Sequence, residues 1–178
     1  MNITIVGLGY VGMSLATLLA QEQRVLALDI DEKKVKKIND KISPIEDKDI
    51  RDYLKNKKLN LIATTNYKEA YTGTDLIIIS TPTNYDPNTN EFDVSSIHLV
   101  IKNILTIIPD CPIFIKSTLP VGLTNDLRNN YSKENIFFSP EFLREGRALA
   151  DNLNPSRIIV GGKTSEAKLF GKLLTSIS

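Results

Sequence analysis

The sequence predicts an α/β domain built on a doubly wound, mostly parallel β-sheet with helices on both faces. Short runs rich in Ile, Val and Leu recur along the chain without alternating with polar residues, which is typical of strands that are buried on both faces. Helical patterns separate several of these runs, and alternating strands and helices form a doubly wound sheet. A glycine-rich turn also follows the first run and precedes a helical pattern, as in sheets of the Rossmann type.

Seven apolar runs are the expected strands: Ile3–Val6, Val25–Asp29, Leu59–Ala63, Leu76–Ser80, Ile113–Lys116, Ile136–Ser139 and Ile158–Gly161. Apolar residues at helical spacing predict the helices Met13–Ala20, 35–42, 50–54, Val94–Ile108 and a final stripe over 169–177. The helix over 94–108 has Asp93 as its expected N-cap and Pro109 as its stop signal. We find no internal repeat and no low-complexity linker, and residues 1–178 are expected to form a single domain.

Composition narrows the class of protein. The 178 residues include 22 Lys and Arg, 21 Asp and Glu, and one cysteine, with a net charge of +1. A chain of this length can bury a hydrophobic core without a metal ion or disulfide bonds. Its near-neutral charge argues against a broad surface that binds nucleic acid. Because Cys111 has no partner within the chain, a reducing, cytoplasmic location is expected. The uncharged stretch Ile3–Ala20 is long enough for a membrane helix, but glycines interrupt it and no basic residue precedes it, so a strand, turn and helix are expected there.

The glycine-rich turn has the sequence Gly7-Leu8-Gly9-Tyr10-Val11-Gly12. Gly7 permits a tight turn, Gly9 lets the backbone approach a pyrophosphate, and Gly12 allows close packing of helix and strand. Asp29 closes the second expected strand, where a carboxylate accepts both hydroxyls of an adenine ribose and repels a 2′-phosphate. The motif therefore favours NAD over NADP, although Lys33 and Lys34 follow closely. A turn without a ligand and a methyltransferase loop are the alternatives.

Three polar segments follow the later strands, at the edge where ligands of open parallel sheets bind, and a fourth precedes the last expected strand. They are Ser80-Thr81-Pro82-Thr83-Asn84, the segment 116–122 (KSTLPVG), the segment 139–146 (SPEFLREG) and Asn154-Pro155-Ser156-Arg157. Thr118 has two interpretations, as the N-cap of a helix begun by Pro120 or as a hydroxyl directed at substrate or water.

Glu141 and Glu145 lie four residues apart and would share one face if this segment were helical. This spacing suits either proton transfer or a surface cluster paired with Arg144 or Arg147. His98 lies within an expected helix and is interpreted as structural. Cys111 precedes a strand, at the edge of the sheet opposite to ligands, and is not expected to be a nucleophile.

Together these motifs resemble the UDP-glucose/GDP-mannose dehydrogenase family, and the resemblance extends over essentially the whole chain. The segments that carry it are GLGYVG at 7–12, STPTN at 80–84, KSTLPVG at 116–122, SPEFLREG at 139–146 and NPSRIIVGG at 154–162. The resemblance implies an NAD-dependent enzyme that oxidises C6 of a sugar nucleotide, most readily UDP-glucose, from alcohol to carboxylate. The reaction reduces two NAD and passes through a thiohemiacetal and a thioester on a cysteine.

Residue roles follow from the same resemblance. It implies that the dinucleotide is bound by Gly7, Gly9, Tyr10, Val11, Gly12, Asp29, Lys34, Pro82, Thr83, Thr118 and Glu145. The catalytic residues would be Thr118 and Glu141, which position a water or assist proton transfer, and Glu145, which lies near the nicotinamide and the water that hydrolyses the thioester. The sugar nucleotide would border Glu141, Phe142, Leu143, Arg144 and Glu145. No metal is implied.

The family's nucleophilic cysteine lies in a C-terminal motif that these 178 residues do not contain. We therefore expect an N-terminal NAD-binding half that is inactive alone, with a homodimer expected for the full-length enzyme. A non-catalytic module that binds or senses NAD(H) is the alternative. The residues that choose among sugar nucleotides are expected outside this segment.

Overall fold

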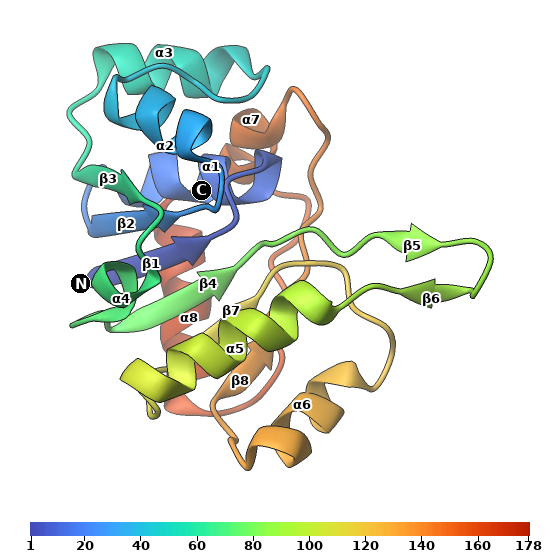
Figure 1. Ribbon diagram of the computed structural model, residues 1–178. Coiled ribbons are helices and arrows are strands. Elements are labelled where there is room, and N and C mark those ends of the chain that lie inside the picture. The colour runs from blue at the N-terminus through green and yellow to red at the C-terminus, as the bar shows by residue number, and fades with distance from the viewer.

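A computed structural model describes residues 1–178, and its central feature is a six-stranded sheet (Figure 1). The strands are β1 (Asn2–Val6), β2 (Arg24–Leu28), β3 (Leu61–Thr64), β4 (Leu76–Ile79), β7 (Ile113–Ile115) and β8 (Ile136–Phe138). They are ordered β3-β2-β1-β4-β7-β8, and every neighbouring pair is parallel. The chain reverses its direction across the sheet between β1 and β4, which is where open α/β sheets bind ligands. The predicted doubly wound fold is confirmed.

Eight helices cover the two faces of this sheet. They are α1 (Tyr10–Leu19), α2 (Glu32–Asn39), α3 (Lys48–Asn56), α4 (Tyr67–Tyr71), α5 (Ser95–Ile107), α6 (Leu123–Tyr131), α7 (Ala148–Leu153) and α8 (Ser165–Ser176). Helices α1, α2, α3, α7 and α8 contribute to the core on one face, whereas α4, α5 and α6 pack on the other. None of these helices combines the length and the apolar character needed to cross a membrane.

The strands are apolar at consecutive positions because both of their faces are covered. In β4, Leu76 and Ile78 belong to the core beneath α1 and α8, while Ile77 and Ile79 belong to the core beneath α5. All four side chains are at most 2% exposed. The unbroken apolar runs of the sequence therefore reflect burial from two sides.

Stacked aromatic rings attach the C-terminal helix to the sheet. The ring of Phe170 on α8 lies with its centroid 3.9 Å from that of Phe114 on β7. Phe114 in turn stacks on Phe137 of β8, at 5.0 Å. All three rings are at most 1% exposed, so α8 closes the core on its face of the sheet.

One expected strand was wrong, and one pair of strands was not expected. The segment 158–161 forms no strand, because only the Gly161 amide reaches the backbone of β8, donating to the Phe138 carbonyl at 2.8 Å. The Ile159 carbonyl, which a further strand would use in the ladder, instead accepts from Ser139 Oγ at 2.7 Å. In addition, a two-stranded antiparallel hairpin of β5 (Tyr85–Asp86) and β6 (Glu91–Phe92) projects from the body of the protein (Figure 1).

The helix boundaries also differ from the expected ones at one important place. Helix α1 begins at Tyr10, three residues before the expected start, so its first turn includes the last glycine of the motif. Helix α5 begins at Ser95 and its N-cap is Val94 rather than the expected Asp93, although the Asp93 carboxylate accepts from the Ser95 amide at 2.9 Å.

Candidate cofactor and substrate site

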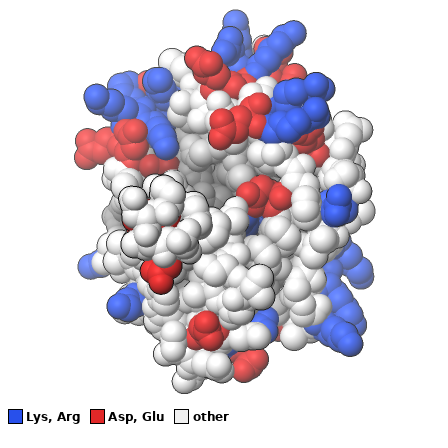
Figure 2. All heavy atoms as spheres, turned by 90° about the vertical axis from the view of Figure 1, so that its right-hand side faces the viewer, with Lys and Arg blue, Asp and Glu red and all other residues white.

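The loops that follow β1, β2, β4, β7 and β8 all lie at the carboxyl edge of the sheet, on the right of Figure 1. Figure 2 faces this edge and shows a hollow beneath a rim on which acidic and basic side chains are mixed. The rim lies at the height of α2 and α3, while much of the face below it carries few charges. The site is therefore a recess with a local charged border.

The principal cavity has a volume of about 530 Å³ and opens at this edge. Its lining comes from the ends of β1, β2 and β4 and from the helices α4 and α5, and includes Gly7, Leu8, Gly9, Asp29, Ile30, Asp31, Lys34, Tyr67, Tyr71, Ser80, Thr81, Pro82, Leu99 and Asn103. This volume is within the range of small-molecule and cofactor sites.

The glycines of the turn have three different roles. A Cβ on Gly12 would lie 1.9 Å from the Gly7 carbonyl oxygen, and one on Gly7 would lie 2.7 Å from the Ser80 carbonyl oxygen. Gly7 also has a φ of +89°, in the region that favours glycine. A Cβ on Gly9, by contrast, would meet nothing within 4 Å. Gly7 and Gly12 thus allow the backbone segments to pack, whereas Gly9 leaves open space beside the cavity.

The amino end of α1 presents free hydrogen-bond donors. Its N-cap, Gly9, has no side chain to accept from the first turn, and the amides of Tyr10, Val11 and Gly12 donate to no protein atom. Four other helices have side-chain caps: α2, α3, α4 and α8. A helix start with free amides beside open space is suited to a phosphate.

Asp29 is fixed at the opposite side of the glycine turn. Its carboxylate accepts from the Leu8 amide at 2.8 Å and from the Asp31 amide at 3.0 Å, and Lys34 Nζ lies 3.5 Å from Oδ2. Two carboxylate oxygens offer about four acceptor positions, so positions remain that can accept hydrogen bonds from ribose hydroxyls. Because Lys34 is paired with Asp29, it does not stand as a free cation for a 2′-phosphate. These residues fit NAD.

Hydroxyl groups tie the loops of this edge together. Ser80 Oγ donates to the Gly7 carbonyl at 2.8 Å, Ser117 Oγ donates to the Thr81 carbonyl at 2.6 Å, and Thr83 Oγ1 donates to the Thr118 carbonyl at 2.8 Å. Three loops from β1, β4 and β7 therefore hold one another in place, and several polar residues of the motifs have a structural function.

The N-cap interpretation of Thr118 was wrong. Helix α6 begins at Leu123 and its N-cap is Gly122, with φ +92°. Thr118 lies in the preceding loop with an exposed side chain, and its hydroxyl makes no hydrogen bond with the protein. Its other interpretation, a hydroxyl directed at substrate or water, remains a prediction.

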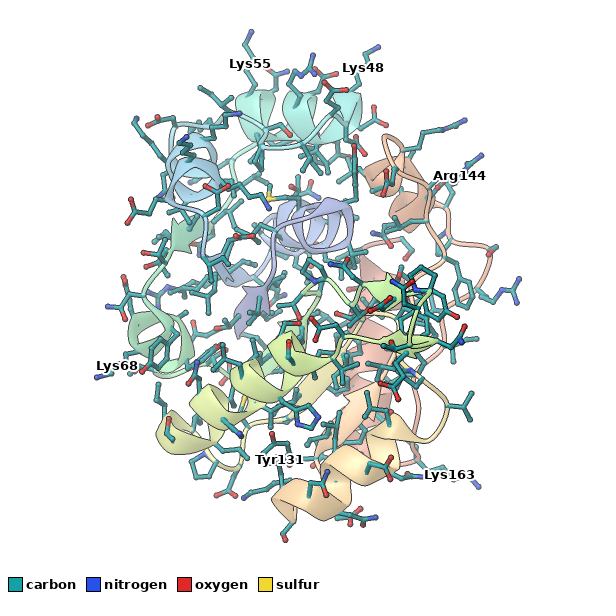
Figure 3. All side chains as sticks on the ribbon, turned by 45° about the vertical axis from the view of Figure 1, so that its right-hand side comes forward. Lys48, Lys55, Lys68, Tyr131, Arg144 and Lys163 are labelled. Atoms are coloured by element: carbon teal, nitrogen blue, oxygen red, sulfur yellow. The ribbon has the colours of Figure 1, made fainter.

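The segment 139–146 forms a loop, so the condition under which Glu141 and Glu145 would share a helical face is not met. Glu141 is half-buried, whereas Glu145 is exposed on a turn. Neither glutamate pairs with Arg144, which instead binds Asp151 of α7 through an ion pair of 2.7 Å. Arg144 lies at the outer edge beside α7 (Figure 3). The proposed surface cluster of the two glutamates is therefore absent.

One further contact fixes this loop. The guanidinium of Arg157 lies 4.8 Å from the ring centroid of Phe142, a cation–π contact. Glu141, Phe142, Leu143 and Arg144 line an open recess of about 430 Å³ with Asp151, Asn154 and Ser156. Four of the five residues expected to bind the sugar nucleotide thus share one surface, and Glu145 lies outside it.

Lys116 is a site residue that the sequence analysis did not select. Its ammonium is buried at the end of β7 and donates to the Pro140 carbonyl at 3.1 Å and to Ser139 Oγ at 3.4 Å. Burial lowers the pKa of Lys116 to about 8, opposed by the nearby Glu141 carboxylate. Burial likewise raises the pKa of Glu141, opposed by a backbone hydrogen bond and by Lys116. A lysine in an apolar run is the signal that could have identified it.

Lys116 and Glu141 line the same small cavity of about 30 Å³. A polar cavity needs about 10–15 Å³ to hold a water molecule. The pair therefore borders a space with room for water beside the 139–146 loop.

The structure divides the expected cofactor residues into two groups. Gly7, Gly9, Asp29, Lys34 and Pro82 line the principal cavity. The others lie outside its lining: Tyr10, Val11 and Gly12 in the first turn of α1, Thr83 and Thr118 in the two joined loops, and Glu145 on the exposed turn. Spacing gave no signal for Tyr67, Tyr71, Leu99 and Asn103, which complete the cavity from α4 and α5.

The remaining histidine and cysteine have structural surroundings. His98 Nδ1 lies 2.9 Å from the hydroxyl of Tyr131, which joins α5 to α6 (Figure 3). Cys111 is buried just before β7 begins, at the edge opposite to the cavity, and burial raises the pKa of its thiol to about 12. A thiol of this kind stays protonated and is not a nucleophile.

The chain was compared with known protein families and structures. Residues 1–177 match the model for the UDP-glucose/GDP-mannose dehydrogenase family, NAD binding domain. The chain is 47% identical to a UDP-glucose 6-dehydrogenase of Streptococcus pneumoniae over 95% of its own length, and 47% identical to that of Campylobacter jejuni over 97%. It spans 43% and 44% of those relatives.

Solved structures agree with this relationship. The GDP-mannose dehydrogenase of Pseudomonas aeruginosa, solved as a ternary complex, has a TM-score of 0.87 at 26% identity, and its match covers 99% of this chain and 44% of that protein. The UDP-D-ManNAc dehydrogenase of Pyrococcus horikoshii has a TM-score of 0.88 at 26% identity, covering 99% and 45%. On the sequence, the fold and these matches, the chain belongs to the UDP-glucose/GDP-mannose dehydrogenase family and corresponds to its NAD-binding domain.

Proposed function

We propose that this chain is the NAD-binding half of a nucleotide-sugar dehydrogenase that oxidises C6 of UDP-glucose to the carboxylate. One observation carries the cofactor part: the free amides that open α1 directly follow Gly9, which lines the same cavity as the fixed carboxylate of Asp29. The two relatives at 47% identity, both UDP-glucose 6-dehydrogenases, support UDP-glucose as the substrate.

In this proposal the first turn of α1 holds the pyrophosphate, and Asp29 accepts the ribose hydroxyls. Lys34 keeps the Asp29 carboxylate in position. When bound, NAD accepts a hydride from the C6 carbon of the substrate. Pro82 and Thr83 border the path toward the nicotinamide, because their loop leads from the cavity to the loop of Thr118.

The groups that handle protons lie in the next two loops. The hydroxyl of Thr118 makes no hydrogen bond with the protein. Glu141 is half-buried, and the small cavity that it lines with Lys116 has room for a water molecule. We infer that Thr118 and Glu141 orient the substrate or a water and move a proton. Glu145 would contribute to catalysis from the exposed turn near the end of the 139–146 loop, which borders the sugar nucleotide in this proposal. Phe142, Leu143 and Arg144 line the open recess of about 430 Å³ in which the sugar nucleotide would lie.

These 178 residues are not expected to complete the reaction alone. The family's reaction requires a nucleophilic cysteine, and the single cysteine of this chain is buried away from the cavity. The remaining substrate groups, and the expected dimer contacts of the full-length enzyme, would come from the parts of the relatives that this chain does not span.

Calorimetric titration of the chain with NAD and NADP tests the cofactor proposal. We expect saturable binding of NAD and much weaker binding of NADP, since a 2′-phosphate would meet the Asp29 carboxylate. Failure of NAD to bind, or equal affinities for the two dinucleotides, would contradict this assignment.

Assays of NADH formation test the catalytic part. A full-length enzyme carrying this domain is expected to oxidise UDP-glucose, whereas the 178 residues alone are expected to bind NAD without turnover. Turnover by the isolated chain would refute the two-part organisation. Binding of NAD by a full-length protein that oxidises no sugar nucleotide would instead favour the non-catalytic module.

A further inference from the structure

Lys116 lines the small cavity of about 30 Å³ behind the 139–146 loop. It directly follows β7, and its backbone amide still donates to the Ile79 carbonyl of β4 at 2.7 Å. The residue is only 6% exposed. Burial of an ammonium group is costly unless the group is hydrogen-bonded or paired with an opposite charge, so the partners of Lys116 indicate what this residue does.

Two of those partners belong to the loop that follows β8. The ammonium donates to the Pro140 carbonyl at 3.1 Å and to Ser139 Oγ at 3.4 Å. Ser139 Oγ in turn donates to the Ile159 carbonyl at 2.7 Å. Lys116 therefore ties the end of β7 to the backbone immediately before Glu141.

The remaining donor of the ammonium has no partner in the protein. An ammonium has three N–H donors, and the protein accepts from two of them. Glu141 and Asn152 line the same cavity as Lys116. The only hydrogen bond of the Glu141 carboxylate is with its own backbone. The Asn152 side chain uses only its amino group, which donates to Ser14 Oγ of α1 at 2.7 Å.

These groups complete a site for one water molecule. The Lys116 ammonium can donate to it, and the Glu141 carboxylate and the Asn152 amide oxygen can accept from it. Buried water molecules make about three hydrogen bonds to polar groups that otherwise lack partners. A water in this cavity would therefore join the ammonium to the carboxylate.

We propose that Lys116 is a positioning residue for Glu141, acting through its bond to Pro140 and through one water molecule that links its ammonium to the Glu141 carboxylate. The inference rests on the proposed function, in which Glu141 moves a proton. The bond to Pro140 fixes the loop that carries Glu141. The positive charge favours the ionised carboxylate, which is the form that accepts a proton.

The other charged side chains at the cavity already have partners. Asp151 of α7 pairs with Arg144 at 2.7 Å, and Arg157 lies over the ring of Phe142. Helices α1 and α8 contribute no charged side chain to the lining. Burial disfavours the charge on Lys116 and on Glu141, and each of these two charges favours the other.

Titration of the chain by carbon-13 NMR measures this link directly. The side-chain carboxyl carbon of Glu141 is followed, and Glu141→Gln identifies its signal. Lys116→Met keeps the length of the side chain and removes the charge. Loss of a nearby opposite charge disfavours the carboxylate, so the titration midpoint of Glu141 is expected to rise by about one pH unit. Lys116→Arg keeps the charge and should restore most of the original midpoint.

The reverse measurement separates an electrostatic link from repacking. Two coupled sites shift each other by the same amount, so Glu141→Gln should lower the midpoint of Lys116 by as much as Lys116→Met raises that of Glu141. Glu141 is a half-buried loop residue, so this variant also provides the test should Lys116→Met fold poorly. A charge on Ser178, which also lines the cavity, is common to all variants.

Lys133→Met is the matched control. Lys133 pairs with Asp110 at 3.2 Å and precedes β8, at the opposite edge of the sheet. Its replacement changes the net charge by the same amount as Lys116→Met does. The midpoint of Glu141 should stay where it is in the unmodified chain.

In the full-length enzyme, the same charge should affect the pH profile. Lys116→Met is expected to move the acidic limb of kcat to higher pH by the shift measured for Glu141, while the Kd for NAD changes by less than about twofold. A purely structural lysine would lower kcat without moving this limb.

An unchanged midpoint of Glu141 in folded Lys116→Met, or an acidic limb that does not move, overturns the inference. A full-length protein that oxidises no sugar nucleotide overturns the proposed function instead, and the NMR titrations still decide whether Lys116 and Glu141 are linked.

Discussion

Replacing Gly12 and Gly9 separately by alanine distinguishes the two functions of the glycine turn. A Cβ on Gly12 would lie 1.9 Å from the Gly7 carbonyl oxygen and 2.7 Å from Ser80 Oγ. The helix would have to move by about 1 Å or more, because non-bonded carbon contacts lie near 3.5–4.0 Å. A Cβ on Gly9 meets no atom within 4 Å. The first change should therefore mainly destabilise the fold, and the second should mainly weaken ligand binding.

The magnitudes follow from these contacts. Overpacking costs about 1–3 kcal/mol, and Gly12→Ala falls near the upper value because its principal contact is with backbone. Alanine has a higher helix propensity than glycine, which offsets about 1 kcal/mol of this loss of stability. A net loss of about 2 kcal/mol lowers the melting temperature by about 4–8 °C in a domain of this size. Gly9→Ala changes only the N-cap, which costs about 0.5 kcal/mol or roughly 1–2 °C.

The effects on NAD binding should be the reverse of the effects on stability: Gly9→Ala should weaken NAD binding more than Gly12→Ala does. The added methyl group of Gly9→Ala would occupy the approach to the free amides of α1. Loss of one hydrogen bond to a charged group costs about 1.5–3 kcal/mol, or about 10- to 100-fold in affinity. Thermal unfolding followed by circular dichroism and titration with NAD measure both quantities. Gly12→Ala with an unchanged melting temperature, or Gly9→Ala with unchanged NAD affinity, would refute this assignment of the glycines.

Three other predictions concern the carboxyl edge. Asp29→Ala should weaken NAD binding by about tenfold or more, because it removes the acceptor for the ribose hydroxyls; calorimetry measures this, and an affinity within twofold of the original would contradict it. In a full-length enzyme, Thr118→Ala and Glu145→Gln should lower kcat far more than they raise the Kd for NAD, and equal losses of NAD affinity in these two variants and Asp29→Ala would argue against the division of roles. Burial lowers the pKa of Lys116 to about 8, from its usual value of 10.5. Between these two pH values Lys116 binds fewer protons in the folded than in the unfolded state, so its contribution to stability rises with pH across this range. Denaturant unfolding should show this rise relative to Lys116→Met, and parallel pH profiles of the two proteins would contradict it.

The wrong expectations have a common physical origin. The four-residue spacing of Glu141 and Glu145 is compatible with a helix, but the segment is a loop that is fixed by Arg144 on Asp151 and by Arg157 on Phe142. Both contacts join residues that are separated along the chain. Similarly, the apolar segment 158–161 satisfies the strand pattern, but a serine side chain of the neighbouring loop takes the carbonyl that a ladder would use.

The amino-acid sequence was enough to predict the sheet and the cofactor motif, because apolar strand runs and glycine turns are patterns of neighbouring residues, and the five ordered motifs were enough for a resemblance to the family. Local spacing therefore predicted six of the strands and the positions of Gly7, Gly9 and Asp29. Only the tertiary structure revealed that Lys116 is buried against the 139–146 loop, and that Tyr71 of α4 faces the cofactor cavity. Burial of a polar group depends on which distant elements cover it, and no pattern within one segment records that arrangement.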